Sequence, residues 1–270
     1  MHDCTWPTPD LVTIHRDFLP GHWRLAARPL GITAAIAVQS QSSQRDTEWL
    51  LKLAEANPCI AGVVGWVDLE AGDAPERIAV LATHPKLRGI RPMLQDLPDD
   101  DWILRAELAP AIEALLAHNL CLDALVRPRH LPQLLRFAER HPDLPIVIDH
   151  AAKPDIANGT MEPWRRCMTA LAELPSVFCK LSGMVTEAGD HWHTRDLLPW
   201  VDHLLGCFGP HRLLWGSDWP VLNLASDYPS WLELSVALTH LDSEDRTALF
   251  GGNAVRFYGL HCEKGIEPCA

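Results

Sequence analysis

Short runs of apolar and β-branched residues alternate with longer amphipathic stretches from about residue 31 to about residue 250. Alternation of this kind is typical of parallel strands joined by helical crossovers. Seven runs are predicted to be strands: Ile32–Gln39, Ile60–Leu69, Leu87–Pro92, Leu120–Val126, Pro145–Asp149, Val177–Leu181 and Leu213–Gly216. The chain is therefore expected to be an α/β protein with a parallel sheet.

The stretches between these runs carry apolar residues at three- and four-residue spacing, which predicts helices with one buried face. They cover Arg45–Glu55, Ala74–Ala82, Leu108–Ala117, Leu131–Arg140, Pro163–Leu174 and Leu197–Phe208, and a last helix covers Ser243–Tyr258. Ser243 is the expected N-cap of that last helix, with acidic residues in its first turn. No Gly-, Ser- or Pro-rich break divides the chain, so residues 1–270 are interpreted as one domain.

Seven strand–helix units fall between two common architectures. A doubly wound open sheet usually has about five or six strands, whereas the common closed barrel has eight. A length of 270 residues suits a barrel. The prediction is a (β/α)8 barrel that lacks its N-terminal first strand, so that Ile32–Gln39 and Leu213–Gly216 face a gap with unpaired backbone groups. On this hypothesis the chain is N-terminally shortened, and the reading frame upstream of Met1 encodes the missing strand.

The composition narrows the classes of partner. Lys and Arg number 23 against 35 Asp and Glu, and the net charge of -12 would repel nucleic acid and an anionic membrane surface. No stretch reaches the roughly 18 apolar residues of a membrane span, and residues 1–7 show no secretory pattern, so a cytoplasmic location is expected. The eight cysteines include no Cys-x-x-Cys pair and are expected to be free. A small-molecule substrate is the expected partner, and a homo-oligomer stays open.

Ionisable side chains stand at the ends of four predicted strands. They are Arg91, His150, Lys180 and Asp218. The carboxyl ends of parallel strands in a barrel meet at one mouth, where active sites are found. A single strand-end His or Asp is as readily a packed or capping residue. Four of them at one mouth favour an active site, because structure alone does not need charges assembled there.

Four segments together carry a resemblance to a known family: Gly89–Asp96, Ile148–His150 with Lys153–Pro154, Cys179–Gly183, and Trp215–Pro220. They resemble the amidohydrolase-related family of TIM-barrel, metal-dependent hydrolases, in the branch of fuconolactonases and other sugar-lactone hydrolases. The likeness runs from about Trp6 to Leu260. It implies a (β/α)8 barrel in which Asp218, on the last strand, is the base or a metal ligand. It also implies that His150, on the sixth strand of the full barrel, lines the mouth.

Members of this superfamily carry a His-x-His pair on the first strand, and this chain begins after that position. The missing upstream strand is expected to supply the pair. The only His-x-His in the chain, His191–His193, lies in a polar segment interpreted as a loop. His150 and Asp218 alone fall short of the three protein ligands usual for catalytic zinc. We therefore expect either no cofactor or one weakly held divalent cation, zinc or manganese, at His150 and Asp218.

The expected reaction is the opening of a small cyclic ester, a sugar lactone first among them, by water. Asp218 would remove the proton from water, and Arg91 or Lys180 would stabilise the developing oxyanion. His150 would orient the water or the carbonyl group.

The expected substrate-binding residues are Gln95, Trp66, Trp219 and Lys153, and Trp102 is a further candidate for a stacking wall. Two alternatives stay open. One is a metal-dependent decarboxylase of the same superfamily, and the other is a truncated barrel without catalytic activity.

Overall fold

A curled sheet of seven parallel strands forms the centre of the computed structural model, which describes residues 5–260. Each strand pairs with the next strand along the chain, in the order β1 to β7. The strands are β1 Ala35–Val38, β2 Ile60–Gly65, β3 Leu87–Ile90, β4 Cys121–Ala124, β5 Ile146–Ile148, β6 Val177–Leu181 and β7 Leu213–Trp215. Each strand lies within one of the predicted runs, so the predicted barrel architecture is confirmed.

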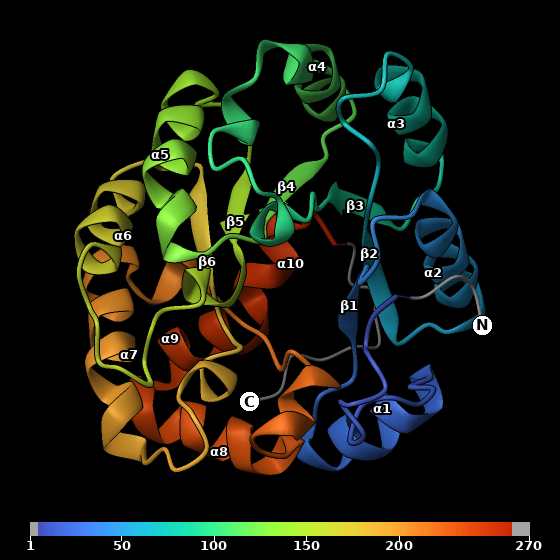
Figure 1. Cartoon of the computed structure of the whole chain (residues 1–270). Helices are drawn as coiled ribbons and strands as arrows, with labels where there is room; N and C mark the ends of the chain where they lie inside the picture. The colour runs from blue at the N-terminus through green and yellow to red at the C-terminus, as the bar shows by residue number, and fades with distance from the viewer. Residues whose placement is uncertain (1–4, 261–270) are drawn as a thin grey trace.

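Helices cover the outer face of the sheet (Figure 1). The six predicted between strands are α2 Gln44–Ala56, α3 Ala74–Ala82, α4 Ala109–Ala117, α5 Leu131–Arg140, α6 Trp164–Ala172 and α7 Thr194–Phe208. Helix α5 illustrates how the spacing of apolar residues predicts a buried face. Its residues Leu131, Leu134 and Phe137 recur on one face and are buried against the core. The strands are covered by helices and therefore consist mostly of apolar residues.

Two further helices were not predicted: α1 Pro20–Ala27 and α8 Tyr228–Thr239. Helix α8 begins at a clear signal, because the carboxylate of Asp227 accepts a hydrogen bond from the Ser230 N–H at 2.8 Å. A proline at its second position also suits a helix start. The helix is apolar on most of its circumference, so the spacing of its residues gave no clear face.

The predicted last helix is three pieces rather than one: α9 Ser243–Thr247, a π-helical turn over Ala248–Gly252, and α10 Asn253–Phe257. The prediction of Ser243 as N-cap is wrong. Asp242 caps α9, because its carboxylate accepts from the Asp245 N–H at 3.0 Å. The π-helical turn contains the Gly251–Gly252 pair, where a regular helix is weakest.

The sheet stays open between β1 and β7, which are not paired with each other in the described residues. The two edge strands lie on either side of an open space, which residues of both strands line. A cavity of about 2130 Å³ runs from the carboxyl ends of the strands into this space. Side chains of β1 and β7, among them Ile36, Val38 and Leu214, line its deeper part. The predicted gap between the first and last strands is therefore observed.

Across residues 5–260, no helix combines the length and apolar character required to cross a lipid bilayer.

Candidate active site

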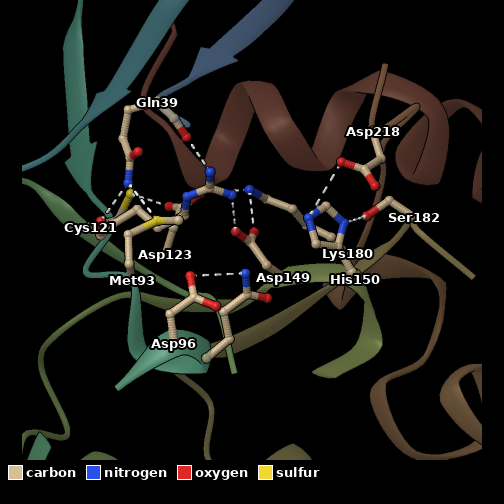
Figure 2. A network of polar contacts seen from close by, with 12 residues as sticks. Gln39, Met93, Asp96, Cys121, Asp123, Asp149, His150, Lys180, Ser182 and Asp218 are labelled. Carbon is tan, nitrogen blue, oxygen red and sulfur yellow. Dashed lines mark hydrogen bonds and ion pairs between the residues drawn. The ribbon is translucent and has the colours of Figure 1, made fainter. Parts of the chain in front are cut away.

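The four strand-end residues predicted from the sequence all line the cavity at the carboxyl end of the sheet. Arg91 directly follows β3, His150 lies two residues after β5, Lys180 is the penultimate residue of β6, and Asp218 lies three residues after β7. Figure 2 shows the side chains of His150, Lys180 and Asp218 close together. The fold therefore brings together residues that are up to 127 positions apart, from 91 to 218.

Two buried carboxylates organise the cations of this site (Figure 2). The Lys180 ammonium lies 2.5 Å from Asp123 Oδ2 and 2.6 Å from Asp149 Oδ1. Arg91 Nη1 lies 3.0 Å from Asp149 Oδ2. The side chains of Asp123 and Asp149 are both 0% exposed. Two cations thus balance two carboxylates, which is the condition under which charges can be buried.

The ion pairs of this network fix the protonation states of Asp149 and Lys180. Burial alone would raise the pKa of Asp149, but the charges of Lys180 and Arg91 outweigh it and hold that pKa far below its ordinary value. Burial opposes the charge of Lys180, yet Asp123 and Asp149 raise its pKa well above the usual value. Asp149 is therefore an anion and Lys180 a cation throughout the neutral range.

A further residue, Tyr258, joins this network from the end of α10. Its hydroxyl donates a hydrogen bond to Asp123 Oδ2 at 2.8 Å. Burial raises the pKa of Tyr258 well above its usual value, so the hydroxyl remains a donor. The C-terminal helix is in this way connected to the centre of the barrel.

Arg91 is also held by the end of β1. Its Nη2 donates to the Gln39 carbonyl oxygen, and Gln39 Nε2 donates back to the Arg91 carbonyl oxygen at 2.8 Å. Gln39 is fully buried. The guanidinium is therefore held from two sides, by Asp149 at Nη1 and by the Gln39 carbonyl oxygen at Nη2.

His150 and Asp218 lie side by side at the mouth without a direct hydrogen bond. His150 Nε2 is 3.6 Å from Asp218 Oδ1, which is too long for a hydrogen bond. The other ring nitrogen, Nδ1, is 2.9 Å from Ser182 Oγ. Burial lowers the pKa of His150, and the nearby carboxylates of Asp218 and Asp149 only partly oppose this. The imidazole is therefore neutral at pH 7 and can share a bridging water with Asp218.

His150 and Asp218 both have left-handed backbone. His150, Ala151, Ala152 and Lys153 have φ angles of 51°, 51°, 61° and 50°, and Asp218 has a φ of 53°. Each such residue costs about 1–2 kcal/mol for an L-amino acid, so the four-residue turn costs roughly 4–8 kcal/mol. Strain of this kind persists only where the surroundings enforce it, and it concentrates at functional sites.

Gly183 makes room for this turn. A Cβ atom at this position would lie 2.8 Å from the His150 Cβ, and the residue itself has a φ of +63°. Both facts require glycine after Ser182, so the end of β6 and the turn after β5 are matched to each other.

The predicted substrate contacts divide into two groups. Gln95, Lys153 and Trp219 line the cavity. Trp66 and Trp102 are not among the residues from 5 to 260 that line it. Trp66 follows β2, where its backbone N–H donates to Thr47 Oγ1 at 2.7 Å.

The aromatic wall of the cavity includes a residue that sequence reasoning missed. Phe18 lies edge-on to Trp219, with ring centroids 5.0 Å apart, and also lines the cavity. It precedes α1 in a segment without periodic pattern, so no signal identified it.

Gln39, Asp123 and Tyr258 were also missed. Asp123 did carry a signal, because it is an acidic residue inside the apolar run Leu120–Val126. A carboxylate in a buried strand needs a partner, and that partner is Lys180.

The metal-ligand set is incomplete in the described part of the chain. Within residues 5–260 there is no group of three or more His, Cys, Asp or Glu side chains placed to hold a metal ion. His150 and Asp218 form a pair only. His191 and His193 are exposed and lie in the segment before α7, outside any strand. Two donors do not make the three-ligand site usual for catalytic zinc.

A curled parallel sheet with ionisable side chains at its carboxyl mouth is the layout of a (β/α)-barrel enzyme. Residues 8–260 match the amidohydrolase family, so the chain belongs to this family. It is 50% identical to an L-fucono-1,5-lactonase of Burkholderia ambifaria over 98% of this chain and 93% of that protein. It is 39% identical to an L-fucono-1,5-lactonase of Burkholderia multivorans over 96% of this chain and 91% of that protein.

A crystal structure of an amidohydrolase from Burkholderia multivorans with bound zinc has the same fold. Its TM-score to this structure is 0.91 at 38% identity, covering 95% of this chain and 93% of that chain.

Proposed function

We propose that this protein hydrolyses a sugar lactone, and that L-fucono-1,5-lactone is the first substrate to test. The observation that carries the proposal is the pairing of Asp218 with a neutral His150 at 3.6 Å, beside an Arg91 that is fixed in place. This is a base, a group that orients water and a cation, and they face one cavity. The similarity to two fuconolactonases supports the substrate class.

In the proposed reaction, water adds to the lactone carbonyl carbon while Asp218 takes its proton. The carbonyl oxygen becomes an oxyanion that Arg91 stabilises, and collapse of this intermediate breaks the bond to the ring oxygen. The proton held by Asp218 returns to the ring oxygen, which leaves as a hydroxyl group. The product is an open-chain hydroxy acid, whose carboxyl group then releases its proton to solvent.

We assign the oxyanion contact to Arg91 rather than to Lys180. The Lys180 ammonium already contacts two carboxylates, at 2.5 and 2.6 Å. An ammonium has three N–H donors, so only one remains for the substrate. We propose that Lys180 acts mainly by holding Asp149, which in turn holds Arg91.

Trp219, Gln95 and Lys153 are proposed to bind the sugar ring, because all three line the cavity. Trp219 offers an aromatic face to the apolar side of the ring, and Gln95 and Lys153 offer hydrogen bonds to its hydroxyl groups. Trp66 is proposed as a more distant contact that supports the mouth from the end of β2.

No step above passes through a metal ion, because His150 and Asp218 provide only two donors. We propose that any divalent cation, zinc or manganese, is held weakly there. Metal analysis after dialysis tests this proposal, and we expect well below one equivalent of either metal. A stoichiometric ion that survives dialysis would contradict it.

The test of the function is a panel of aldonolactones, followed by the acid released from each. We expect L-fucono-1,5-lactone to be hydrolysed faster than lactones that differ in ring stereochemistry. Asp218→Asn should lower the rate by about 10²–10⁴-fold, whereas Asp202→Asn, an exposed control on α7, should not change it. Carboxylic acids tested beside the lactones address the alternatives: release of carbon dioxide from an acid would favour the decarboxylase, and inactivity on all substrates would favour a barrel without catalysis.

A further inference from the structure

The backbone after β5 forms an unusual left-handed turn that contains no glycine. Four consecutive residues, His150 to Lys153, have positive φ angles. Asn and Gly are the residues that adopt this conformation readily, and none is present here. The turn therefore depends on contacts from outside the segment.

One such contact comes from α6. The indole N–H of Trp164, the first residue of that helix, donates to the Ala151 carbonyl oxygen at 2.7 Å. Trp164 is 1% exposed, and Ala151 is fully buried. Trp164 is itself fixed by an edge-on contact with Trp200 on α7, with ring centroids 4.9 Å apart.

The direction of this hydrogen bond selects the backbone conformation. A return of Ala151 to right-handed backbone would swing its carbonyl oxygen away from Trp164 and leave it buried without a partner. The same rotation would move the His150 ring away from Ser182, to which it is hydrogen-bonded at 2.9 Å, and away from Asp218, which lies 3.6 Å from it. The hydrogen bond thus opposes relaxation of the turn.

We infer that Trp164 is a positioning residue of the active site. Its N–H holds the Ala151 carbonyl and thereby keeps the left-handed turn that aims His150 at Asp218. Trp164 does not line the cavity among residues 5–260, so it acts through the turn and not on the substrate. This inference rests on the role of His150 in the proposed function.

The kinetic test compares Trp164→Phe with Trp200→Phe. The first variant keeps an aromatic ring but loses the donor. The second makes the same change in the partner ring, which within residues 5–260 gives no hydrogen bond to the turn. We expect Trp164→Phe to lower kcat about 5- to 30-fold with little change in KM. In a His150→Gln background it should lower the residual rate less than twofold.

A measurement independent of activity separates this inference from the proposed function. The imidazole signals of His150, assigned by their loss in His150→Gln, should shift in the NMR spectrum of Trp164→Phe and stay unchanged in Trp200→Phe. They should shift whether or not the protein hydrolyses lactones. If the wild type does not hydrolyse lactones but Trp164→Phe still shifts the His150 signals, the proposed function is overturned and this inference is not.

A second variant keeps the test valid if phenylalanine disturbs packing. Benzothienylalanine, placed at position 164 by codon suppression, replaces the indole N–H with sulfur at nearly the same size. The same change in the His150 signals and in kcat is expected. Unchanged His150 signals in both variants, or equal effects of Trp164→Phe and Trp200→Phe, would overturn the inference.

Discussion

The closed and open sides of the barrel hold their acidic residues in different ways. On the closed side, Asp149 follows β5, which pairs with strands on both flanks, and its carboxylate is 0% exposed and bound by Lys180 and Arg91. On the open side, Asp218 follows the edge strand β7, and its carboxylate is 18% exposed. Its only partner at ion-pair distance within residues 5–260 is His150, at 3.6 Å.

This difference indicates which carboxylate can accept a proton. The lone pairs of Asp149 are occupied by two cations, which lower its pKa, so it is a poor base at neutral pH. The carboxylate of Asp218 lines the cavity beside a neutral histidine, and within residues 5–260 no Lys or Arg lies at ion-pair distance from it. In the proposed mechanism, the closed side supplies fixed charge, and the open side supplies the group that moves a proton.

The largest expected effect is on the open side. Asp218→Asn keeps the size of the side chain but removes its basicity, so kcat should fall by about 10²–10⁴-fold with little loss of stability. Steady-state hydrolysis of the best lactone and thermal unfolding measure the two quantities. Near-normal turnover in this variant would show that Asp218 is not the base.

On the closed side, the matching substitution Asp149→Asn should act first on stability. It leaves Arg91 and Lys180 with one buried carboxylate between them, and breaking a buried ion pair of this kind costs about 3–5 kcal/mol. Urea unfolding measures the loss of free energy. The control is Asp143→Asn, because Asp143 is exposed and lies between α5 and β5. This variant should change the free energy of unfolding by less than about 0.5 kcal/mol.

Asp149→Asn and the wild type should also lose different amounts of stability in acid. The pKa of Asp149 is lower in the folded state than the value of about 3.9 in the unfolded chain. Its contribution to stability is therefore fully present above that unfolded pKa and is lost as the pH falls through the folded pKa. Urea unfolding at pH 5 and pH 3 should show a smaller acid-induced loss in Asp149→Asn than in the wild type. Equal losses would mean that Asp149 is not held as an anion by its neighbours.

The contrast between the two sides also shows what could be predicted from the sequence. The seven strands follow from apolar runs whose length and spacing leave few alternatives, and the strand-end rule located Arg91, His150, Lys180 and Asp218. The partners of these residues depend on long-range contacts. Asp123 contacts both Lys180 and Tyr258, which lie far from it in the chain, and no local pattern pairs them.

The backbone conformation of the turn after β5 could not be predicted from the sequence either. The left-handed turn at His150–Lys153 contains no glycine or asparagine, so composition gives no hint of it. It exists because tertiary contacts outweigh local preference. The N-cap at Asp242 is a simpler case, because a carboxylate one position earlier was overlooked in favour of Ser243.

A moderate effect is expected at Arg91, the residue of the closed side that is proposed to contact the substrate. Arg91→Lys keeps the positive charge but loses the planar fork that contacts Asp149 and Gln39 together. We expect kcat/KM to fall about 10- to 100-fold, in line with the loss of charged hydrogen bonds. Arg77→Lys, a partly exposed arginine on α3, serves as the control. Unchanged kinetics in Arg91→Lys would show that the guanidinium geometry does not matter.

The smallest expected effect separates two tryptophans on opposite sides of the gap. Trp219 follows the edge strand β7, lines the cavity and contacts Phe18, whereas Trp66 follows the paired strand β2 and lies away from the described cavity lining. Trp219→Ala should raise KM about three- to tenfold through the loss of aromatic contact with the sugar ring. Trp66→Ala should change KM less than twofold and act mainly on stability, because its ring is half-buried among protein atoms. Lactone saturation curves and thermal unfolding of both variants test this ranking. A larger rise in KM for Trp66→Ala would place the sugar on the closed side of the barrel, away from the base proposed here.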